Sequence, residues 1–591
     1  MSARELITEH LDLWTGAVTK KSSSGRGSNG KVKLTGVKRL RELILELAVR
    51  GRLVHQDENE EPAALLAEKI ATEKAALMQA GAIKKSPKLP EISPDEIPFD
   101  IPNGWHWIRL GELVKKIGSG ATPRGGKNAY VQSGIPFLRS QNIWNDGLNL
   151  QDVAYIPPET HERMANTHVF PNDILLNITG ASLGRCTVVP TEIEMANVSQ
   201  HVTIIRTIDP LNRSYLHYLI LSPYVQSLVW GRQVGMAREG LSKKVLEQFE
   251  IPLPPLEEQH RIVQKVDELM ALCDRLEQQT SDQLEAHETL VDTLLGTLTQ
   301  SENATELADN WARLAAHFDT LFTTEQSIDK LKQTILQLAV MGRLVEPDAG
   351  DEPAAEVVKR AHEKKAQLLS DKLIKKQKEL PDITEPEKPF SIPPLWAFAR
   401  LDDICTEVTS GSTPPKSEFS ETSGIPYLKV YNIRSQRVDF DYKPQFVTEN
   451  YHRTTLKRSQ LLPGDVVMNI VGPPLGKTAI IPNDHPEWNC NQAIVRFRPI
   501  EIELNQFIHL YLKAGMFLKT IELIGTAGQD NISVTKSRSI VIPLPPKAEQ
   551  HRIVQKVDEL MALCDQLKER LNQASETRNQ LAEAVVQGAL N

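Results

Sequence analysis

The chain has 591 residues, 40% of them hydrophobic and 24% charged, with a net charge of −8 at neutral pH. That length predicts several domains, and no apolar run approaches the roughly 18 to 20 residues that a membrane-spanning helix needs. The polar N-terminal residues do not form the apolar core of a signal peptide, and the five cysteines contain no Cys-x-x-Cys pair. We therefore expect a cytoplasmic protein without a zinc site or a disulfide framework.

Residues 1–104 are predicted to form an N-terminal helical region that ends in a proline-rich linker. Helices are expected from Val37 to Arg50, with Gly51 as the stop, and from Pro62 to Lys85. The Ser/Gly-rich loop 18–36 lies in a stretch that carries eight Lys or Arg and no acid between Lys20 and Arg41. It fits either a flexible solvated loop or an arm that contacts phosphates.

Residues 105–255 are predicted to form a mixed α/β domain. Short apolar runs at 134–138, 173–178 and 201–205 alternate with Gly, Asn and Pro and read as strands, whereas Tyr215 to Gly231 reads as a helix. Residues 106–254 carry 14 Lys or Arg against 12 Asp or Glu, and residues 397–546 carry 16 against 15. Two balanced segments within an acidic chain remain compatible with a basic binding face.

The second half of the chain repeats the first. The seventeen residues Glu258–Asp274 recur unchanged as Glu549–Asp565, an offset of 291 residues, and further matches keep nearly the same offset. His10-Leu-Asp resembles His317-Phe-Asp at an offset of 307, which places a 16-residue insertion in the first copy. We predict an internal duplication with pseudo-two-fold symmetry and with the two termini near each other. The further domains are then a central helical segment at 256–395, a second α/β domain at 396–546 and a C-terminal helix at 547–591.

The repeated stretch is predicted to be a long helix with a coiled-coil seam, because its apolar residues alternate spacings of four and three. About 40 residues at a rise of 1.5 Å give a rod of roughly 60 Å. Two antiparallel rods would form a spacer that holds the α/β domains apart; the alternative is an ordinary helical hairpin in a globular core. The predicted seam consists of Ile262, Val266, Leu269, Cys273, Leu276, Ile553, Val557, Leu560, Cys564 and Leu567.

Catalytic patterns are absent from the sequence. The segment Gly118–Lys127 approaches a phosphate loop, but its spacing is off by one and no Ser or Thr follows the lysine. Asn469-Ile-Val-Gly-Pro-Pro lacks the residue order of an adenine methyltransferase element, and the paired histidines lie on helices without ligand partners. We therefore assign no catalytic and no metal residue.

Side chains suited to reading DNA occur at equivalent places in the two α/β domains. Arginine can pair with guanine, Asn and Gln with adenine, and Lys or Ser with phosphates, although each also fits an ordinary polar loop. Different side chains at matching positions would read different bases. The candidates are Thr122, Arg124, Lys127, Arg139, Gln141, Asn142, Arg238, Lys243, Lys244, Lys416, Lys429, Tyr431, Asn432, Arg434, Gln529, Asn531, Lys536 and Arg538.

Four motifs occur twice in order: Ser-Gly-x-Thr-Pro, Gly-Ile-Pro-aromatic-Leu, Asn-Ile, and Ile-Pro-Leu-Pro-Pro-x-x-Glu-Gln-x-x-Ile-Val-x-x-Val-Asp. Over essentially its whole length the chain thereby resembles the specificity subunit of type I restriction–modification systems. The resemblance implies an α+β fold in which two target recognition domains are joined by long antiparallel coiled-coil helices. Each domain would read one half of an asymmetric bipartite DNA site, and the chain itself would not be an enzyme.

The resemblance also implies partners. Two modification subunits would dock on the helices and methylate adenine N6 with S-adenosylmethionine, and two restriction subunits would add ATP- and Mg²⁺-dependent cleavage. No cofactor is then expected in this chain. Two alternatives remain: a stand-alone DNA-binding scaffold, or an enzyme whose motifs escape recognition, and methyl transfer by the purified chain would separate them.

Overall fold

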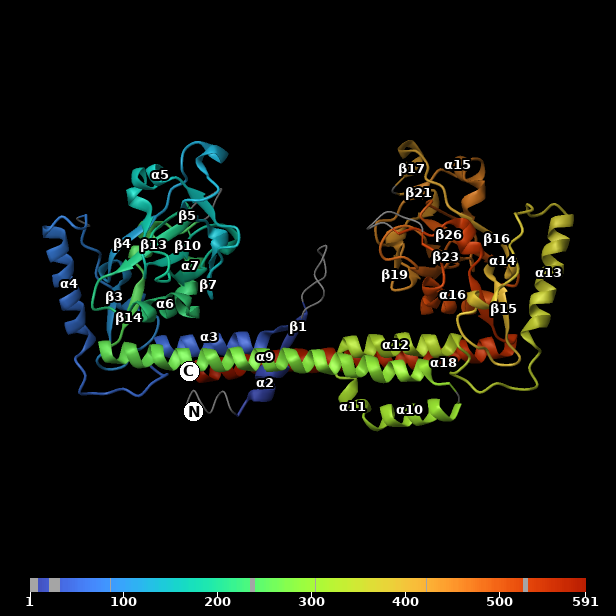
Figure 1. Cartoon of the computed structure of the whole chain (residues 1–591), viewed down its shortest axis with the longest axis horizontal. Coiled ribbons are helices and arrows are strands. Elements are labelled where there is room, and N and C mark those ends of the chain that lie inside the picture. The colour runs from blue at the N-terminus through green and yellow to red at the C-terminus, as the bar shows by residue number, and fades with distance from the viewer. Residues whose placement is uncertain are drawn as a thin grey trace. The chain divides into compact units, whose positions relative to one another are not determined.

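The computed structural model describes residues 9–20, 32–84, 87–233, 240–302, 304–420, 422–523 and 530–590 (Figure 1). It forms two compact units, one comprising residues 1–283 with 574–591 and the other residues 284–573. The division cuts both long helices, α9 (Leu256–Gln300) and α18 (Lys547–Leu590), so each unit holds one end of each helix. Among the described helices, none combines the length and apolar character that a membrane crossing requires.

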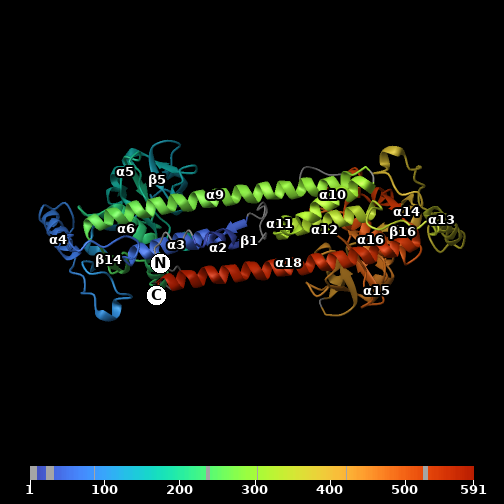
Figure 2. The same cartoon turned by 90° about the horizontal axis from the view of Figure 1, so that it is seen from below.

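The helical part of unit 1 is built around α3 (Thr35–Val49), which lies beside both long helices (Figure 2). Just beyond α3, Arg52 donates to the carbonyl oxygen of Leu590 at the end of α18 (2.9 Å). A few residues later Gln56 donates to Glu258 at the start of α9 (2.7 Å). The end of α18 and the start of α9 therefore meet the same segment, so the two helices run antiparallel within unit 1.

Unit 2 repeats these contacts around α12 (Glu325–Val340), with the roles of the two long helices exchanged. Arg343 donates to the carbonyl oxygen of Thr299 near the end of α9 (3.1 Å), and Arg552 near the start of α18 donates to Asp351 (2.6 Å). The duplication predicted from the sequence is thus present in the contacts. Among the ion pairs that correspond at an offset of 291 are Arg41–Asp274 with Lys332–Asp565, and Arg39–Glu583 with Lys330–Asp292.

The predicted seam residues of the long helices face inward. Ile262, Val266, Leu269 and Cys273 are buried in α9, as are Ile553, Val557 and Cys564 in α18, whereas the remaining three leucines are half-buried. In unit 2 the seam packs together with α12 and with residues of the α/β domain in one apolar core. The seam is therefore covered by shorter helices and by the α/β domain.

Each α/β domain stands on the helices of its own unit (Figure 1) and is built from three small sheets and a two-stranded hairpin. The hairpin is β6 (Ile143–Trp144) with β7 (Gly147–Leu148) in unit 1 and β19 (Ile433–Arg434) with β20 (Arg437–Val438) in unit 2. In unit 1 the strand orders are β11-β10-β13-β4, β8-β5-β12-β9 and β14-β3, where β5 and β12 are parallel and the other pairs antiparallel. The strands are β3 (His106–Arg109), β4 (Val114–Ser119), β5 (Ile135–Leu138), β8 (Ala154–Ile156), β9 (His168–Val169), β10 (Ile174–Asn177), β11 (Cys186–Val188), β12 (Ala196–Val198), β13 (Val202–Thr207) and β14 (Glu250–Leu253). The helices are α5 (Pro158–Arg163), α6 (Arg213–Leu221), α7 (Pro223–Gly231) and α8 (Lys243–Glu247).

The α/β domain of unit 2 has the strand orders β16-β26-β23-β24, β17-β21-β18-β25-β22 and β15-β27. Its strands are β15 (Ala397–Arg400), β16 (Cys405–Ser410), β17 (Phe419–Ser420), β18 (Ile425–Leu428), β21 (Phe446–Val447), β22 (Gln460–Leu461), β23 (Val466–Asn469), β24 (Thr478–Ile480), β25 (Trp488–Cys490), β26 (Ile494–Pro499) and β27 (Val541–Leu544). Its helices are α14 (Leu401–Ile404), α15 (Glu449–Arg453), α16 (Leu504–Ala514) and α17 (Val534–Arg538). The cores are apolar strand residues such as Leu175 and Ile204 in unit 1 and Val467 and Ile494 in unit 2.

The remaining helices and strands lie outside the two α/β domains. They are α2 (Leu11–Gly16), β1 (Val18–Lys20), β2 (Val32–Leu34), α4 (Ala63–Gln79), α10 (Ala304–Ala316), α11 (Phe318–Leu321) and α13 (Ala354–Ser370). β1 pairs with β2, and most of the predicted basic loop between them lies in residues 21–31, outside the described residues. The predicted proximity of the two termini concerns residues 1 and 591, which are likewise outside them.

Two predicted helices differ from those in the structure. The helix predicted from Tyr215 to Gly231 is two helices, because Pro223 has no N–H to continue α6 and Ser222 caps α7 by accepting from Val225 N (3.3 Å). The helix predicted to reach Lys85 ends at Gln79, because Gly81 adopts a φ of +69°.

A buried arginine ties each linker to its α/β domain. Arg109 donates to the carbonyl oxygens of Pro90 (3.1 Å) and Gln248 (2.7 Å) and pairs with Glu96 (2.8 Å) and Glu250 (2.5 Å). Arg400 repeats this arrangement 291 residues later, with Pro381, Ser539 and Glu387 as partners. The proline-rich linkers are therefore held at defined positions, and their only regular structure among the described residues is a short 3-10 turn in each, Pro94–Glu96 and Glu385–Glu387.

Candidate nucleic-acid interface

The predicted readout loops follow β5 and β18, and a buried asparagine shapes each one. Asn142 accepts a hydrogen bond from Arg139 N (2.9 Å) and donates to the carbonyl oxygen of Asn149 (2.9 Å). Asn432 accepts from Lys429 N (2.9 Å) and donates to the carbonyl oxygen of Tyr442 (2.8 Å). Both amides are thus used to hold a turn, so in the free protein they position the neighbouring side chains.

In unit 1 the loop carries an exposed tryptophan beside cations. Trp144 is 41% exposed, and its indole donates to the carbonyl oxygen of Gln141 (2.9 Å). The guanidinium of Arg185 lies 3.9 Å from the tryptophan ring centroid, a cation–π contact. Arg139 donates to the carbonyl oxygen of Asp152 (2.5 Å), and Gln141 is exposed. The loop therefore offers a flat aromatic surface, a guanidinium and an amide.

In unit 2 the same loop carries tyrosines and different cations. The guanidinium of Arg434 lies 4.2 Å from the Tyr442 ring centroid and 3.3 Å from Asp439, and the Tyr431 ring lies 6.2 Å from Tyr442. Partial burial raises the pKa of Tyr431, with a smaller contribution from Tyr442. The ammonium of Lys429 lies 4.8 Å from the Phe419 ring centroid, and burial lowers its pKa. The two loops share a backbone shape and differ in side-chain chemistry.

A second predicted group lies on the loop after β4 in unit 1 and after β16 in unit 2. Thr122 donates to Gln200 (3.4 Å), and Thr413 donates to Gln492 at the corresponding place in unit 2. Arg124 is exposed in unit 1, as is Lys416 in unit 2. Lys127 belongs to a short 3-10 turn, and its side chain lies outside the described residues.

The structure brings the first two groups together at one end of the α/β domain. Asn177, the last residue of β10, donates to the carbonyl oxygen of Ser140 in the loop after β5 (2.9 Å). Thr179 contacts the His201 ring (2.6 Å), next to the Gln200 that holds Thr122. In unit 2, Asn491 N donates to the carbonyl oxygen of Leu428, and Ser412 N to that of Cys490 (both 3.1 Å). Each domain thus presents one loop cluster.

A third group of predicted residues does not stay together in the structure. It consists of Arg238, Lys243, Lys244, Gln529, Asn531, Lys536 and Arg538. Arg238 and Gln529 lie outside the described residues, although Gly240 and Asn531 return to the loop clusters through bridges to Thr179 and Val471. Asn531 keeps a buried side-chain oxygen without a hydrogen-bond partner among the described atoms.

The remaining members of the third group lie on short helices away from the loop clusters. Lys243 pairs with Glu247 on α8 (3.3 Å), and Lys244 is exposed beside it. On α17, Lys536 pairs with Glu522 (2.8 Å) and Arg538 donates to Asp402 (2.8 Å).

Sequence reasoning missed Trp144, Arg185, Tyr442 and Lys443. Lys443 has a φ of +55°, and its ammonium lies 5.3 Å from the Tyr442 ring centroid. Aromatic residues next to Asn-Asp-Gly and Asp-Tyr-Lys turns were a usable clue, but their cationic neighbours come from distant or left-handed positions that spacing does not reveal. Among the described residues, no three His, Cys, Asp or Glu side chains gather as a metal site, and the five cysteines are buried and free.

The fold and its loops define a duplicated protein with two similar α/β domains on long helices, each with an exposed cluster of cations, amides and aromatic rings. The family model described as "Type I restriction modification DNA specificity domain" matches residues 102–286 and 393–576. The chain is 39% identical over 609 aligned residues to the type I restriction enzyme EcoEI specificity subunit, and 37% over 610 to the EcoAI specificity subunit. Both are Escherichia coli proteins, and each alignment covers 100% of both chains.

Among solved structures, a chain described under "complex assembly and conformational transition of the type I R-M system" matches with a TM-score of 0.47 and 18% identity, covering 84% of this chain and 99% of that one. The HsdS subunit from Thermoanaerobacter tengcongensis matches with a TM-score of 0.38 and 18% identity, covering 84% of this chain and 98% of that one. From the family model and the two Escherichia coli relatives, the chain belongs to the family of type I restriction–modification DNA specificity subunits, with two target recognition domains.

Proposed function

We propose that each target recognition domain reads one half of an asymmetric bipartite DNA site through its loop cluster. The observation that carries this proposal is that equivalent loops have one backbone shape and different side chains, Trp144 with Arg185 in unit 1 and Tyr442 with Arg434 in unit 2. A shared shape docks both domains in the same way, whereas different donors and ring surfaces select different bases. The exposed side chains contact the DNA, and Asn142, Asn432 and Arg538 keep their loops and helices in position.

The chain contributes recognition, and the chemistry belongs to its partners. Two modification subunits bind against the long helices and methylate adenine N6 with S-adenosylmethionine, which requires the target base to be flipped out of the duplex. Two restriction subunits add ATP- and Mg²⁺-dependent cleavage. The relatives' description as specificity subunits supports this division of labour. The complex acts on DNA in the cytoplasm.

A methylation map tests the proposal. We would co-express the chain with its cognate modification subunit and locate methylated adenines across the genome by long-read sequencing. The expected result is one asymmetric motif of two short halves around a fixed, unspecified gap. Replacing residues 105–255 with the domain of a relative should change one half only. Methylation at a short continuous sequence would contradict the two-domain reading.

A further inference from the structure

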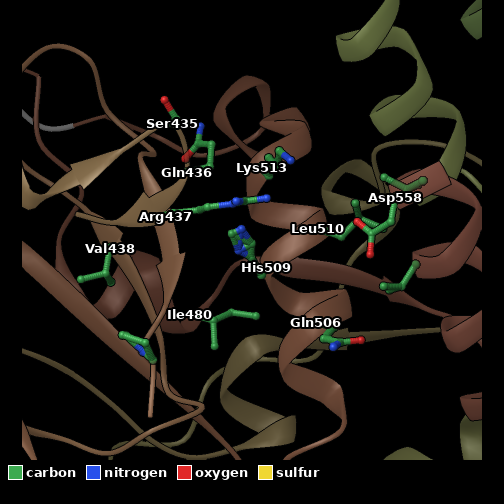
Figure 3. Close-up of a pocket in the computed structure, with 13 residues that line it drawn as sticks. Ser435, Gln436, Arg437, Val438, Ile480, Gln506, His509, Leu510, Lys513 and Asp558 are labelled. Atoms are coloured by element: carbon green, nitrogen blue, oxygen red, sulfur yellow. The ribbon is translucent and has the colours of Figure 1, made fainter. Parts of the chain in front are cut away.

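Unit 2 contains a cavity lined by two cationic residues that have no cationic counterparts in unit 1. It has a volume of about 430 Å³ and lies where the second recognition domain meets α18 (Figure 3). Its walls come from the turn between β19 (Ile433–Arg434) and β20 (Arg437–Val438), from β24 and its end, from α16 and from α18. A volume of that size falls in the range of small-ligand pockets, which is roughly 300–1,000 Å³.

Two cations and a histidine meet in this cavity. Figure 3 shows Arg437 extending toward α16, with the side chains of Lys513 and His509 on either side of it. Within the described part of the chain, neither Arg437 nor Lys513 has a carboxylate oxygen within the 4.0 Å of an ion pair. Burial lowers the pKa of Lys513, and the nearby positive charges of Lys332 and Arg437 lower it further, whereas Asp558 and Asp565 oppose this. Two like charges with no carboxylate in ion-pair contact are an unfavourable arrangement that an anion would relieve.

His509 is also incompletely satisfied. Its Nδ1 atom is buried and has no hydrogen-bond partner among the described atoms. Burial lowers the pKa of His509 to about 4, with a smaller contribution from Lys513, so the ring is neutral at physiological pH. A neutral imidazole can present one N–H as a donor. Asp558 is the acid in the lining; against Arg437 and Lys513 it leaves one excess positive charge.

In unit 1 a side-chain hydrogen bond spans the same junction. At an offset of 292 residues, Tyr218 stands where Leu510 stands in unit 2. Its hydroxyl donates to Asp267, which corresponds to Asp558 at an offset of 291. His217, the counterpart of His509, has its ring nitrogen 3.3 Å from the carbonyl oxygen of Cys186. Gly147 and Leu221 correspond to Arg437 and Lys513, so both cations are particular to unit 2. The tyrosine bridge of unit 1 is replaced in unit 2 by a cavity with cationic walls.

We propose that this cavity is an anion-binding site for a small molecule that carries a carboxylate or phosphate group. Arg437 and Lys513 hold the anionic group, His509 donates a hydrogen bond to it, and the aliphatic side chains of Ile480, Leu510 and Val557 contact the rest of the ligand. Because the walls come from both the recognition domain and α18, a bound ligand fastens the second domain to its spacer helix, as Tyr218 and Asp267 do in unit 1. The site does not depend on the DNA sequence that the protein reads.

Thermal unfolding of the full-length chain tests the site. We would compare the unfolding midpoint in inorganic phosphate, in citrate and in sodium chloride at matched ionic strength. A ligand that binds only the folded state raises the midpoint, here by about 1–2 °C at a concentration several times its dissociation constant. A rise in phosphate alone would identify the ligand group as phosphate, and a rise in citrate alone would identify it as carboxylate. An equal midpoint in all three salts would overturn the proposal.

Three variants make the test specific to the cavity. Arg437→Met, at an exposed position, and Lys513→Met should each lose the anion-dependent rise. Leu510→Tyr, which copies the residue of unit 1, should fill the cavity, raise the midpoint without added anion and abolish the response to it. If Lys513→Met does not fold, Arg437→Met and Leu510→Tyr decide the matter. A rise that persists in these two variants would place the anion elsewhere and contradict the site.

Discussion

At the scale of single residues, the loop clusters contain two kinds of cation, and under the proposed function one kind reads bases and the other holds phosphates. Arg434 is exposed after β18 and is oriented by Tyr442 and Asp439. Lys416 is exposed on the neighbouring loop and has no ion pair or cation–π contact with the residues that the structure describes. An oriented guanidinium suits bidentate recognition of guanine, and a mobile ammonium acts as a point charge on the backbone. We therefore expect replacement of Arg434 and replacement of Lys416 to weaken DNA binding in different ways.

Replacing Arg434 with Ala should cost about 1–3 kcal/mol of binding to the cognate site and relax specificity in one half only. Replacing Lys416 with Met should weaken binding to all sequences alike and lower the salt dependence of log K by about one. Titrations of the modification complex with cognate and scrambled duplexes at several salt concentrations measure both effects. Lys375→Met, at an exposed lysine far along the chain in the loop after α13, serves as the control for loss of a charge. Altered preference in both halves with Arg434→Ala would contradict its assignment to one domain.

The linker carboxylates predict how stability depends on pH. Hydrogen bonds from Arg400 lower the pKa of Glu387 from 4.5 to about 2, with a further contribution from Thr384. Because the folded-state pKa is the lower one, the carboxylate stabilises the fold above about pH 4.5, and that stabilisation is lost as the pH falls toward 2. Glu387→Gln should thus lower the unfolding midpoint at neutral pH, and the difference from the unmodified protein should shrink below pH 4.5. The exposed Glu379, as Gln, provides the control, and a pH-independent difference would show that the effect is not electrostatic.

At the scale of elements, glycines with a positive φ end the helices of unit 1. Gly51 and Gly81 follow α3 and α4 with φ values of +68° and +69°. A Cβ on Gly51 would lie 2.3 Å from Cγ of Pro102, whereas a Cβ on Gly81 would meet nothing within 4 Å. Gly81→Ala should cost about 1–2 kcal/mol from the left-handed backbone alone. Gly51→Ala should cost more, by about 1–3 kcal/mol, because packing is added to the same strain.

Denaturant unfolding of the two variants measures this difference. Both glycines lie in unit 1 at nearly equal φ, so each variant is the control for the other. Equal losses would mean that Pro102 moves aside freely and that the linker does not hold the end of α3. A larger loss for Gly51→Ala would show that linker packing against the helix end contributes to stability.

The same elements show what the sequence could predict. α9 and α18 were foreseen because a double proline precedes a regular spacing of apolar residues, and both signals are local. The β strands of the cores were foreseen as apolar runs. The division between α6 and α7 was missed because the apolar pattern continues through Ser222 and Pro223. Short strands such as β9 and β17, with two residues each, have no sequence pattern of their own and exist only through their neighbours.

The candidate site shows the same contrast between local sequence signals and contacts that depend on the fold. The loops after β5 and β18 were located from matching positions in the two copies, which needs no knowledge of folding. The inward direction of Asn142 and Asn432 was not visible in the sequence, because it follows from hydrogen bonds to residues seven to ten positions away. The contact between Trp144 and Arg185 joins two separate loops and could be found only in the fold.

At the scale of the whole molecule, the duplication gives the two recognition domains equivalent junctions with the helices. Both begin and end on an antiparallel strand pair, β3 with β14 and β15 with β27, and both continue through Pro-Leu-Pro-Pro into a long helix. Residues 258–274 of the first long helix and 549–565 of the second are identical. Within the units, the ends of α9 and α18 exchange roles around α3 and α12. Equivalent junctions should accept either domain without loss of folding.

A chain in which residues 105–255 also replace residues 396–546 should therefore recognise a symmetric site. We expect the modification complex to methylate a motif whose two halves are the same sequence on opposite strands, because two identical domains in a duplication with pseudo-two-fold symmetry would read opposite strands. The anion cavity, which needs Arg437 and Lys513 from the second domain, should be lost in this chain. Methylation mapping provides the readout, and the reciprocal chain with two second domains is the matched control. Two identical halves repeated in the same direction would show that the copies follow one another along the DNA and would exclude a two-fold relation between them.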